Sequence, residues 1–250
     1  MGVDSGLPDF RGTEGFWRAY PPYRNLGLAF EEIADPVHFA EDPELAWGFY
    51  GHRLGLYRET VPHAGFGVLR EWSRHRPARV FTSNVDGQFQ RAGFADDVVA
   101  ECHGSIHHLQ CVAGCGQPVW PADGVVVAVD PESMRAAAPL PACPGYGGLA
   151  RPNILMFGDW SWRPERSQVQ LDAHTAWLRA LRTDGARLAV VEIGAGTAVP
   201  TVRRQAELAS ATSGGLIRIN VREPEVRHGR GVGLASPAAT TLEALDALLA

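Results

Sequence analysis

Arg79-Val80-Phe81-Thr82-Ser83-Asn84-Val85-Asp86-Gly87 joins a short apolar segment to a polar one. Residues 79–82 are rich in β-branched and aromatic side chains, which predicts a short buried strand. The polar residues follow at the carboxyl end of this strand, where open α/β sheets bind ligands. Asn84 and Asp86 are therefore candidates to hold hydroxyl or amide groups, although each alone is better explained as a turn residue or a solvated side chain.

A second candidate segment is Glu101-Cys102-His103-Gly104-Ser105. The imidazole of His103 can accept or donate a proton near neutral pH. Cys102 stands beside it, but neighbouring residues of an extended segment point to opposite faces, so we do not expect the thiol to take part. His107 and His108 are expected to be surface or loop residues.

The rest of the chain alternates between predicted helices and strands. Helical patterns cover 26–60, 64–75, 202–211 and 241–249, and apolar runs at 188–193 and 216–221 predict strands. Strands that alternate with helices predict an α/β fold with a parallel, doubly wound sheet. Residues 109–150 differ, with many Pro and Gly, three Cys and one β-like run at Val125–Val129. We interpret them as an inserted module.

Bulk composition limits the classes of function. The 250 residues are 45% hydrophobic, which is enough for a sizeable core, and the net charge of -5 gives no support for generic nucleic-acid binding. No apolar run approaches the roughly 20 residues needed to span a bilayer. The first 12 residues do not have the pattern of a signal peptide. The four cysteines are unevenly placed, which favours a reduced compartment, so we expect a cytoplasmic protein.

Several motifs taken together resemble one family. Besides the two segments above they are Ser5-Gly6-Leu7-Pro8-Asp9-Phe10-Arg11-Gly12, residues 151–159 (Arg-Pro-Asn-Ile-Leu-Met-Phe-Gly-Asp), Gly194-Ala195-Gly196-Thr197 and residues 216–220. The order of these motifs and the residues within them resemble those of the sirtuins, a family of NAD-dependent protein deacylases, and the resemblance runs from Gly2 to the C-terminus. The resemblance implies a Rossmann-like NAD-binding domain (1–25, 76–108 and 151–250) and a small domain, built from a helical module (26–75) and a zinc-type module (109–150).

The resemblance also implies an NAD site. Gly194-Ala195-Gly196-Thr197 lies between a predicted strand and a predicted helix, where backbone N–H groups can bind a phosphate, although such a turn is weak evidence alone. In sirtuins the matching loop and Asn220 contact the adenosine half of NAD. Asp9, Phe10 and Arg11 match a loop over the nicotinamide ribose, and Asn84 and Asp86 match the nicotinamide pocket. Ser83 stands where the family usually has Gln, so its ribose contact is expected to be shorter or water-mediated.

The implied reaction transfers an acyl group from a protein lysine to NAD-derived ribose. The acyl oxygen attacks the ribose carbon that bears nicotinamide, and His103, with Asn84 and Asp86 beside it, is expected to act as general base. The products are free lysine, nicotinamide and O-acyl-ADP-ribose. A neutral imidazole, with a pKa of about 6.5, suits this role.

The acyl group is expected to contact Tyr50, Arg53, Ile154 and Phe157 by the same resemblance. Tyr50 and Arg53 are one helical turn apart and could clasp a carboxylate. This Tyr-x-x-Arg pattern resembles sirtuins that remove succinyl, malonyl or glutaryl groups. The alternative is a buried tyrosine with a surface arginine.

The sequence departs from the family at its zinc motif. Cys111, Cys115 and Cys143 match three of the four expected ligands, but Tyr146 stands in the fourth position. A closed structural zinc site has four ligands. Either three thiolates hold zinc with a water or a nearby His, or Tyr146 packs across the gap.

A second departure is at the N-terminus. Sirtuins begin with a strand and a Gly-Ala-Gly turn, whereas Met1 of this chain falls after both. We expect either that the natural start lies upstream or that the chain is truncated and binds NAD less well. Two other functions therefore stay open: an NAD glycohydrolase or mono-ADP-ribosyltransferase, and a degenerate module that binds NAD or ADP-ribose.

Overall fold

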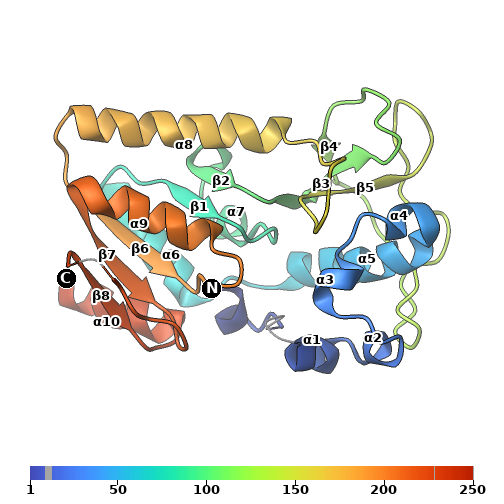
Figure 1. Cartoon of the computed structure of the whole chain (residues 1–250), viewed down its shortest axis with the longest axis horizontal. Helices are drawn as coiled ribbons and strands as arrows, with labels where there is room; N and C mark the ends of the chain where they lie inside the picture. The colour runs from blue at the N-terminus through green and yellow to red at the C-terminus, as the bar shows by residue number, and fades with distance from the viewer. Residues whose placement is uncertain (9–12, 228, 250) are drawn as a thin grey trace.

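The computed structural model describes residues 1–8, 13–227 and 229–249. Figure 1 shows two parts side by side along the longest axis. One contains the parallel strands β6, β7 and β8 with helices around them. The other contains helices α1 to α5 and the antiparallel strands β3, β4 and β5.

The parallel strands confirm the expected fold class but form two sheets. Strand β1 (Val80–Thr82) pairs with β2 (Val99–Glu101). Strand β7 (Gly214–Ile219) pairs with β6 (Leu188–Ile193) on one edge and with β8 (Gly231–Leu234) on the other. Within the described residues, β1 and β6 each pair with only one strand. The apolar run of β6 is typical of a strand covered on both faces. In the structure, however, Glu192 is the only buried residue of β6, and the others are half-buried or exposed.

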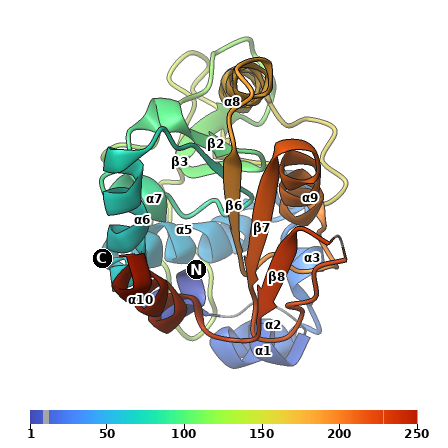
Figure 2. The ribbon, with the colours of Figure 1, turned by 90° about the vertical axis from the view of Figure 1, so that its left-hand side faces the viewer.

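Helices cover both sides of the three-stranded sheet. Figure 2 shows α9 (Thr201–Ser213) on one side, and α10 (Ala238–Leu249) with α6 (Ala64–His75) on the other. Helix α8 (Glu165–Thr183) packs on β2. The short helix η1 (Gly2–Ser5) lies against α6 and α10, since Asp4 accepts a hydrogen bond from the Ala239 N–H, and Ser5 Oγ accepts one from the His63 N–H. None of the helices among the described residues is long and apolar enough to cross a membrane.

The second part is built around helix α5 (Pro43–Glu59), which is buried on most of its surface. Asp42 caps its first turn by accepting from the Leu45 N–H, and Pro43 suits the first helical position. Four short helices surround it: α1 (Thr13–Ala19), α2 (Pro21–Asn25), α3 (Phe30–Ile33) and α4 (His38–Glu41). Residues 26–60 therefore form three helices in succession. The rings of Phe16, Tyr20, Tyr23 and Phe49 meet at centroid distances of 5.4–6.0 Å and form the aromatic centre of the core.

The inserted segment packs on the same helix. Strand β3 (Gly104–Cys111) lies between β4 (Trp120–Pro121) and β5 (Ala150–Ile154) in an antiparallel sheet. The predicted strand at Val125–Val129 is wrong: only Val129 makes a bridge, to Ala136. The run instead follows α5, where Arg58 donates to the Val125 carbonyl. A Cβ atom at Gly48 would overlap the Met134 carbonyl, so only glycine permits this close contact.

Candidate active site

Strands β1 and β2 bring two of the predicted segments together. Their register pairs Thr82 with Glu101, so the residues that follow each strand lie at the same edge of the sheet. The Cys102 N–H donates to the Thr82 carbonyl at 2.9 Å, and the Asn84 N–H donates to Thr82 Oγ1 at 3.0 Å. Asn84, Asp86 and His103 therefore all come from the carboxyl end of this parallel pair. Asn84 is exposed, Ser83 and His103 are half-buried, and Asp86 is buried.

The environment of His103 favours a neutral imidazole. Burial lowers the pKa of His103, because removing water disfavours the charged ring. The side chain is therefore able to accept a proton at neutral pH. Burial raises the pKa of the neighbouring Cys102 thiol to about 12, which keeps it protonated, in agreement with its expected lack of a chemical role.

A bulge in β3 shapes the turn that carries Asp86. The pairing of β3 with β5 shifts between Ser105 and Leu109, so residues 106–108 have no partner in β5. The Ile106 N–H donates instead to the Val85 carbonyl at 3.0 Å. Bulges beside binding sites commonly redirect side chains in this way.

His107 on this bulge holds the Asp86 turn directly. Its Nε2 lies 3.0 Å from the Asp86 carbonyl oxygen, so the ring donates a hydrogen bond there. The ring also packs against Gly87, where a Cβ atom would come within 2.6 Å of His107 Cδ2. Gly87 has φ +67°, a conformation that glycine adopts without strain. The expectation that His107 and His108 are surface or loop residues is therefore wrong, because both lie on β3 and are half-buried.

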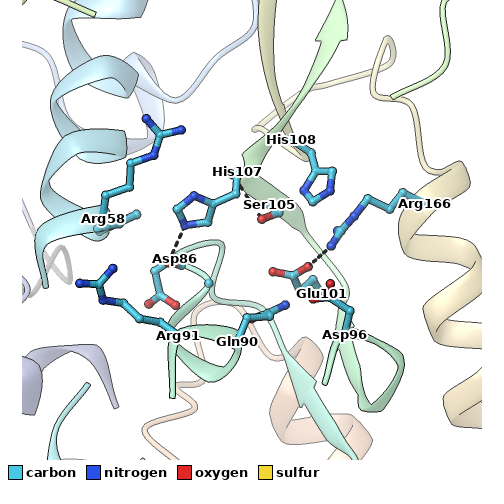
Figure 3. Close-up of a pocket in the computed structure, with 12 residues that line it drawn as sticks. Arg58, Asp86, Gln90, Arg91, Asp96, Glu101, Ser105, His107, His108 and Arg166 are labelled. Carbon is cyan, nitrogen blue, oxygen red and sulfur yellow. Dashed lines mark hydrogen bonds and ion pairs between the residues drawn. The ribbon is translucent and has the colours of Figure 1, made fainter. Parts of the chain in front are cut away.

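A cavity of about 230 Å³ lies beside the Asp86 turn. Figure 3 shows its polar side chains, which come from α5, the Asp86 turn, the short helix α7 (Gln88–Arg91), the short helix η2 (Asp96–Val98), β2, β3 and α8. Burial raises the pKa of Asp86, although the Gln88 N–H, which donates to its carboxylate, opposes the shift. Opposite Asp86, Arg166 forms an ion pair with the buried Glu101 at 2.6 Å. The sequence pattern did not predict this cavity, because its walls depend on the bulge in β3 and on the position of α8.

The second predicted loop lies at the carboxyl ends of β6 and β7. Asn220 donates from Nδ2 to the Ala195 carbonyl at 2.9 Å, which joins the two loops. The N–H and the Oγ1–H of Thr197 both donate to the carboxylate of Glu223, at 3.1 and 2.5 Å. The loop thus already binds an oxyanion. Its donors fit a phosphate of a dinucleotide, which carries the same kind of oxygen. Glu223 is a candidate site residue that the sequence analysis missed.

Two of the residues predicted to contact an acyl group, Tyr50 and Arg53, meet within the aromatic core. The guanidinium carbon of Arg53 lies 5.6 Å from the Tyr50 ring centroid, and both residues are buried, so the two side chains share one face of α5. Arg53 donates from Nε and Nη2 to the Tyr57 hydroxyl at 2.9 and 2.7 Å. Burial raises the pKa of Tyr50 to about 12, so its hydroxyl is protonated and can donate. The alternative of a surface arginine is excluded.

Phe157 is connected to this cluster through Phe30. Their rings meet edge to face at 6.1 Å, and the Phe30 ring lies 5.9 Å from the Arg53 guanidinium. Ile154 is buried at the end of β5, opposite Gly104. The loop beyond it is shaped by the buried ion pair of Arg151 and Asp159, at 2.8 Å.

Three cysteines could hold a metal ion. The Sγ atoms of Cys111, Cys115 and Cys143 lie within 4.8 Å of one another, and thiolates are the preferred donors for Zn²⁺. The side chains present therefore fit a thiophilic ion. Tyr146 is 63% exposed, so it does not pack across the gap as one alternative supposed. Asp9, Phe10 and Arg11 lie outside the described residues.

Comparison with known proteins gives one consistent family. A model of the Sir2 family matches residues 1–177. An NAD-dependent protein deacylase of Mycolicibacterium paratuberculosis is 28% identical over 250 residues, covering 100% of this chain and 92% of that protein. The NAD-dependent protein deacylase 1 of Pseudomonas aeruginosa is 30% identical, covering 98% of this chain and 89% of its own length. The mitochondrial sirtuin-5 deacylase of Canis lupus familiaris is 32% identical over 64% of this chain, which spans 53% of that protein.

Solved structures agree with these relatives. A Sir2 homologue in complex with NAD superposes with a TM-score of 0.73 at 26% identity, over 99% of this chain and 84% of its own. A variant Sir2 homologue in complex with ADP-ribose gives a TM-score of 0.70 at 25% identity, over 98% of this chain and 86% of its own.

Proposed function

This chain belongs to the Sir2 family, and from that membership we propose that it is an NAD-dependent protein-lysine deacylase. The observation that carries the proposal is that Asn84, Asp86 and His103 all follow the carboxyl ends of one parallel strand pair. The Gly194–Thr197 loop occupies the corresponding edge of the second sheet. The substrates are NAD and acylated lysines of proteins, and the location we propose is the cytoplasm.

In this proposal, each of the two parallel sheets binds a different part of NAD. The Gly194–Thr197 loop offers its backbone and hydroxyl donors to a phosphate, and Asn220 holds that loop in place. At the other sheet, Ser83, Asn84 and Asp86 would hold the ribose and the carboxamide. When bound, NAD supplies the activated ribose carbon. We assign this role to residues 1–25, 76–108 and 151–250, and the acyl-lysine contacts to the small domain and Phe157.

His103 is the proposed general base. Its lowered pKa means that the ring is neutral at pH 7, so it can take a proton from a ribose hydroxyl as that oxygen attacks. The carbonyl of His103 accepts from the Leu155 N–H at 3.0 Å, which fixes its backbone beside the loop that carries Phe157. Base and acyl-binding loop are thereby held together.

The test is to incubate the protein with NAD and an acetylated peptide, and to follow nicotinamide and O-acyl-ADP-ribose by mass spectrometry. We expect both products in the wild type. His103→Ala should lower turnover at least about 100-fold, because a positioned base contributes ~10²–10⁴. His75→Ala is the matched control, since His75 is exposed and pairs only with Glu71 among its described ion pairs. Nicotinamide release without the acylated product would support an NAD glycohydrolase instead, and NAD binding without either product would support a degenerate module.

We further propose that the site favours acyl groups with a terminal carboxylate. Tyr50 and Arg53 place a hydroxyl donor and a guanidinium on one buried face, joined through Phe30 to Phe157. A carboxylate there would meet a two-pronged donor in a site of low dielectric constant.

The acyl preference is tested with succinyl and acetyl peptides of the same sequence. Arg53→Lys keeps the charge but loses the planar donor pair, so we expect it to lower kcat/KM for the succinyl peptide by about tenfold or more, the loss of one charge-assisted contact. Activity on the acetyl peptide reports whether the variant is folded. An unchanged ratio between the two peptides would contradict the assignment.

A further inference from the structure

The three-cysteine cluster joins the end of one strand to two turns. Cys111 ends β3, Cys115 follows in the next turn, and Cys143 begins the turn that reaches Gly148. The Sγ atoms of Cys115 and Cys143 are 3.6 Å apart. Cys111 and Cys143 are buried, whereas Cys115 is exposed. The sulfur atoms thus converge on one point near the surface.

The fourth side of the cluster is open. Within the described residues, no other His, Cys, Asp or Glu belongs to the group that could hold an ion here. The ring of Tyr146 lies against Gly148, and Tyr146 is 63% exposed. Cβ atoms built at Gly114, Gly116 and Gly147 would meet nothing within 4 Å, so these turn glycines face open space.

A tetrahedral ion bound to three thiolates keeps one position for a ligand from solution. We propose that this cluster is a three-thiolate site for a thiophilic divalent ion, such as Zn²⁺ or Cd²⁺, whose fourth position takes an exchangeable water or a small free thiol. Binding the ion replaces three S–H bonds by three S–metal bonds and releases three protons. A free thiol then displaces water and loses one proton, and nothing is oxidised or reduced.

For this reason the site binds a metal ion differently from a closed four-cysteine centre. One thiolate fewer gives weaker retention of the ion, and the open position lets chelators and thiols reach it. Its geometry is independent of NAD, so the proposal does not rest on the deacylase activity.

The experiment uses Co²⁺ as a visible probe in the reduced, metal-free full-length protein. We expect one equivalent of Co²⁺ to give thiolate-to-metal absorption. An excess of 2-mercaptoethanol should shift the d–d bands to longer wavelength as a fourth sulfur binds. Tyr146→Cys should show the shifted bands without added thiol and should release Co²⁺ to a chelator about tenfold more slowly, as expected for an added ligand contact. Tyr146→Ser is the matched control and should behave as the wild type does.

Two results would overturn the proposal. The first is a wild-type protein that binds no stoichiometric Co²⁺, or one whose spectrum is insensitive to added thiol; this measurement needs no variant. The second is a Cys115→Ser variant that keeps the full thiolate absorption, which would place the ion elsewhere. Because Cys115 is exposed, this substitution leaves the buried core unchanged.

Discussion

The hydrogen bond from His107 to the Asp86 carbonyl predicts that two adjacent histidines differ sharply in their contribution to stability. Both lie on the β3 bulge and line the same cavity. His107 Nε2 is hydrogen-bonded to the carbonyl at 3.0 Å, whereas His108 Nδ1 is buried and has no hydrogen-bond partner among the described residues. His107→Leu leaves the carbonyl of a buried turn without a partner, which costs about 1–3 kcal/mol. His108→Leu removes an unsatisfied polar atom, so its expected cost is about zero or slightly negative.

The assay is thermal unfolding of both variants beside the wild type. For a chain of this size about 2 kcal/mol lowers Tm by about 4–8 °C, so His107→Leu should melt well below His108→Leu. His107→Leu should also raise KM for NAD more than it changes kcat, because the turn positions Asp86 rather than the reacting atoms. Equal Tm values for the two variants would refute the assigned role of His107, and so would a lower Tm for His108→Leu.

Three further predictions follow from buried or competing charges. Glu223→Gln replaces the carboxylate that accepts from the Thr197 donors by a weaker, neutral acceptor. Because charged and neutral hydrogen bonds differ by about 0.5–1 kcal/mol, calorimetry should show ADP-ribose binding about two- to fivefold more tightly. Weaker binding would refute this prediction. Glu192→Leu removes the bidentate partner of Arg218, whose side chain is 0% exposed. The free energy of unfolding in urea should fall by about 3 kcal/mol, and a decrease under about 1 kcal/mol would contradict the role of this buried ion pair. Finally, burial lowers the pKa of His103, and it lowers the pKa of His108 to about 4. The unfolded chain therefore binds more protons than the folded chain between about pH 6.5 and 4, so Tm should fall as the pH falls through this range. A constant Tm would contradict this prediction.

Much of the framework was predicted from local pattern. The expected helix at 64–75 and strand at 188–193 have the bounds of α6 and β6. Residues 64–75 carry helical apolar periodicity and residues 188–193 form an apolar run, and these local patterns predict the type of element even though only one residue of β6 is buried. The run Val125–Val129 satisfied the same pattern but lacks a neighbouring strand, so its backbone bonds to α5 instead.

The candidate site was predicted in part. The sequence placed Asn84 and Asp86 after a predicted strand, but it predicted no strand before His103; the pairing of β1 with β2 puts the residues that follow each strand at one edge. It did not predict His107, because the bond to the Asp86 carbonyl exists only through the register shift of β3 against β5. Nor did it predict Glu223, which reaches Thr197 from a separate loop.

Alone, then, the sequence determined the family resemblance, the candidate site residues and the positions of several helices and strands, because strand period and family motifs are local properties of the chain. Tertiary structure alone decided which side chains hold them in place, how the parallel strands divide into two sheets, and that the fourth side of the cysteine cluster is open. Those outcomes depend on contacts between residues far apart in the chain, whose distances no local pattern encodes.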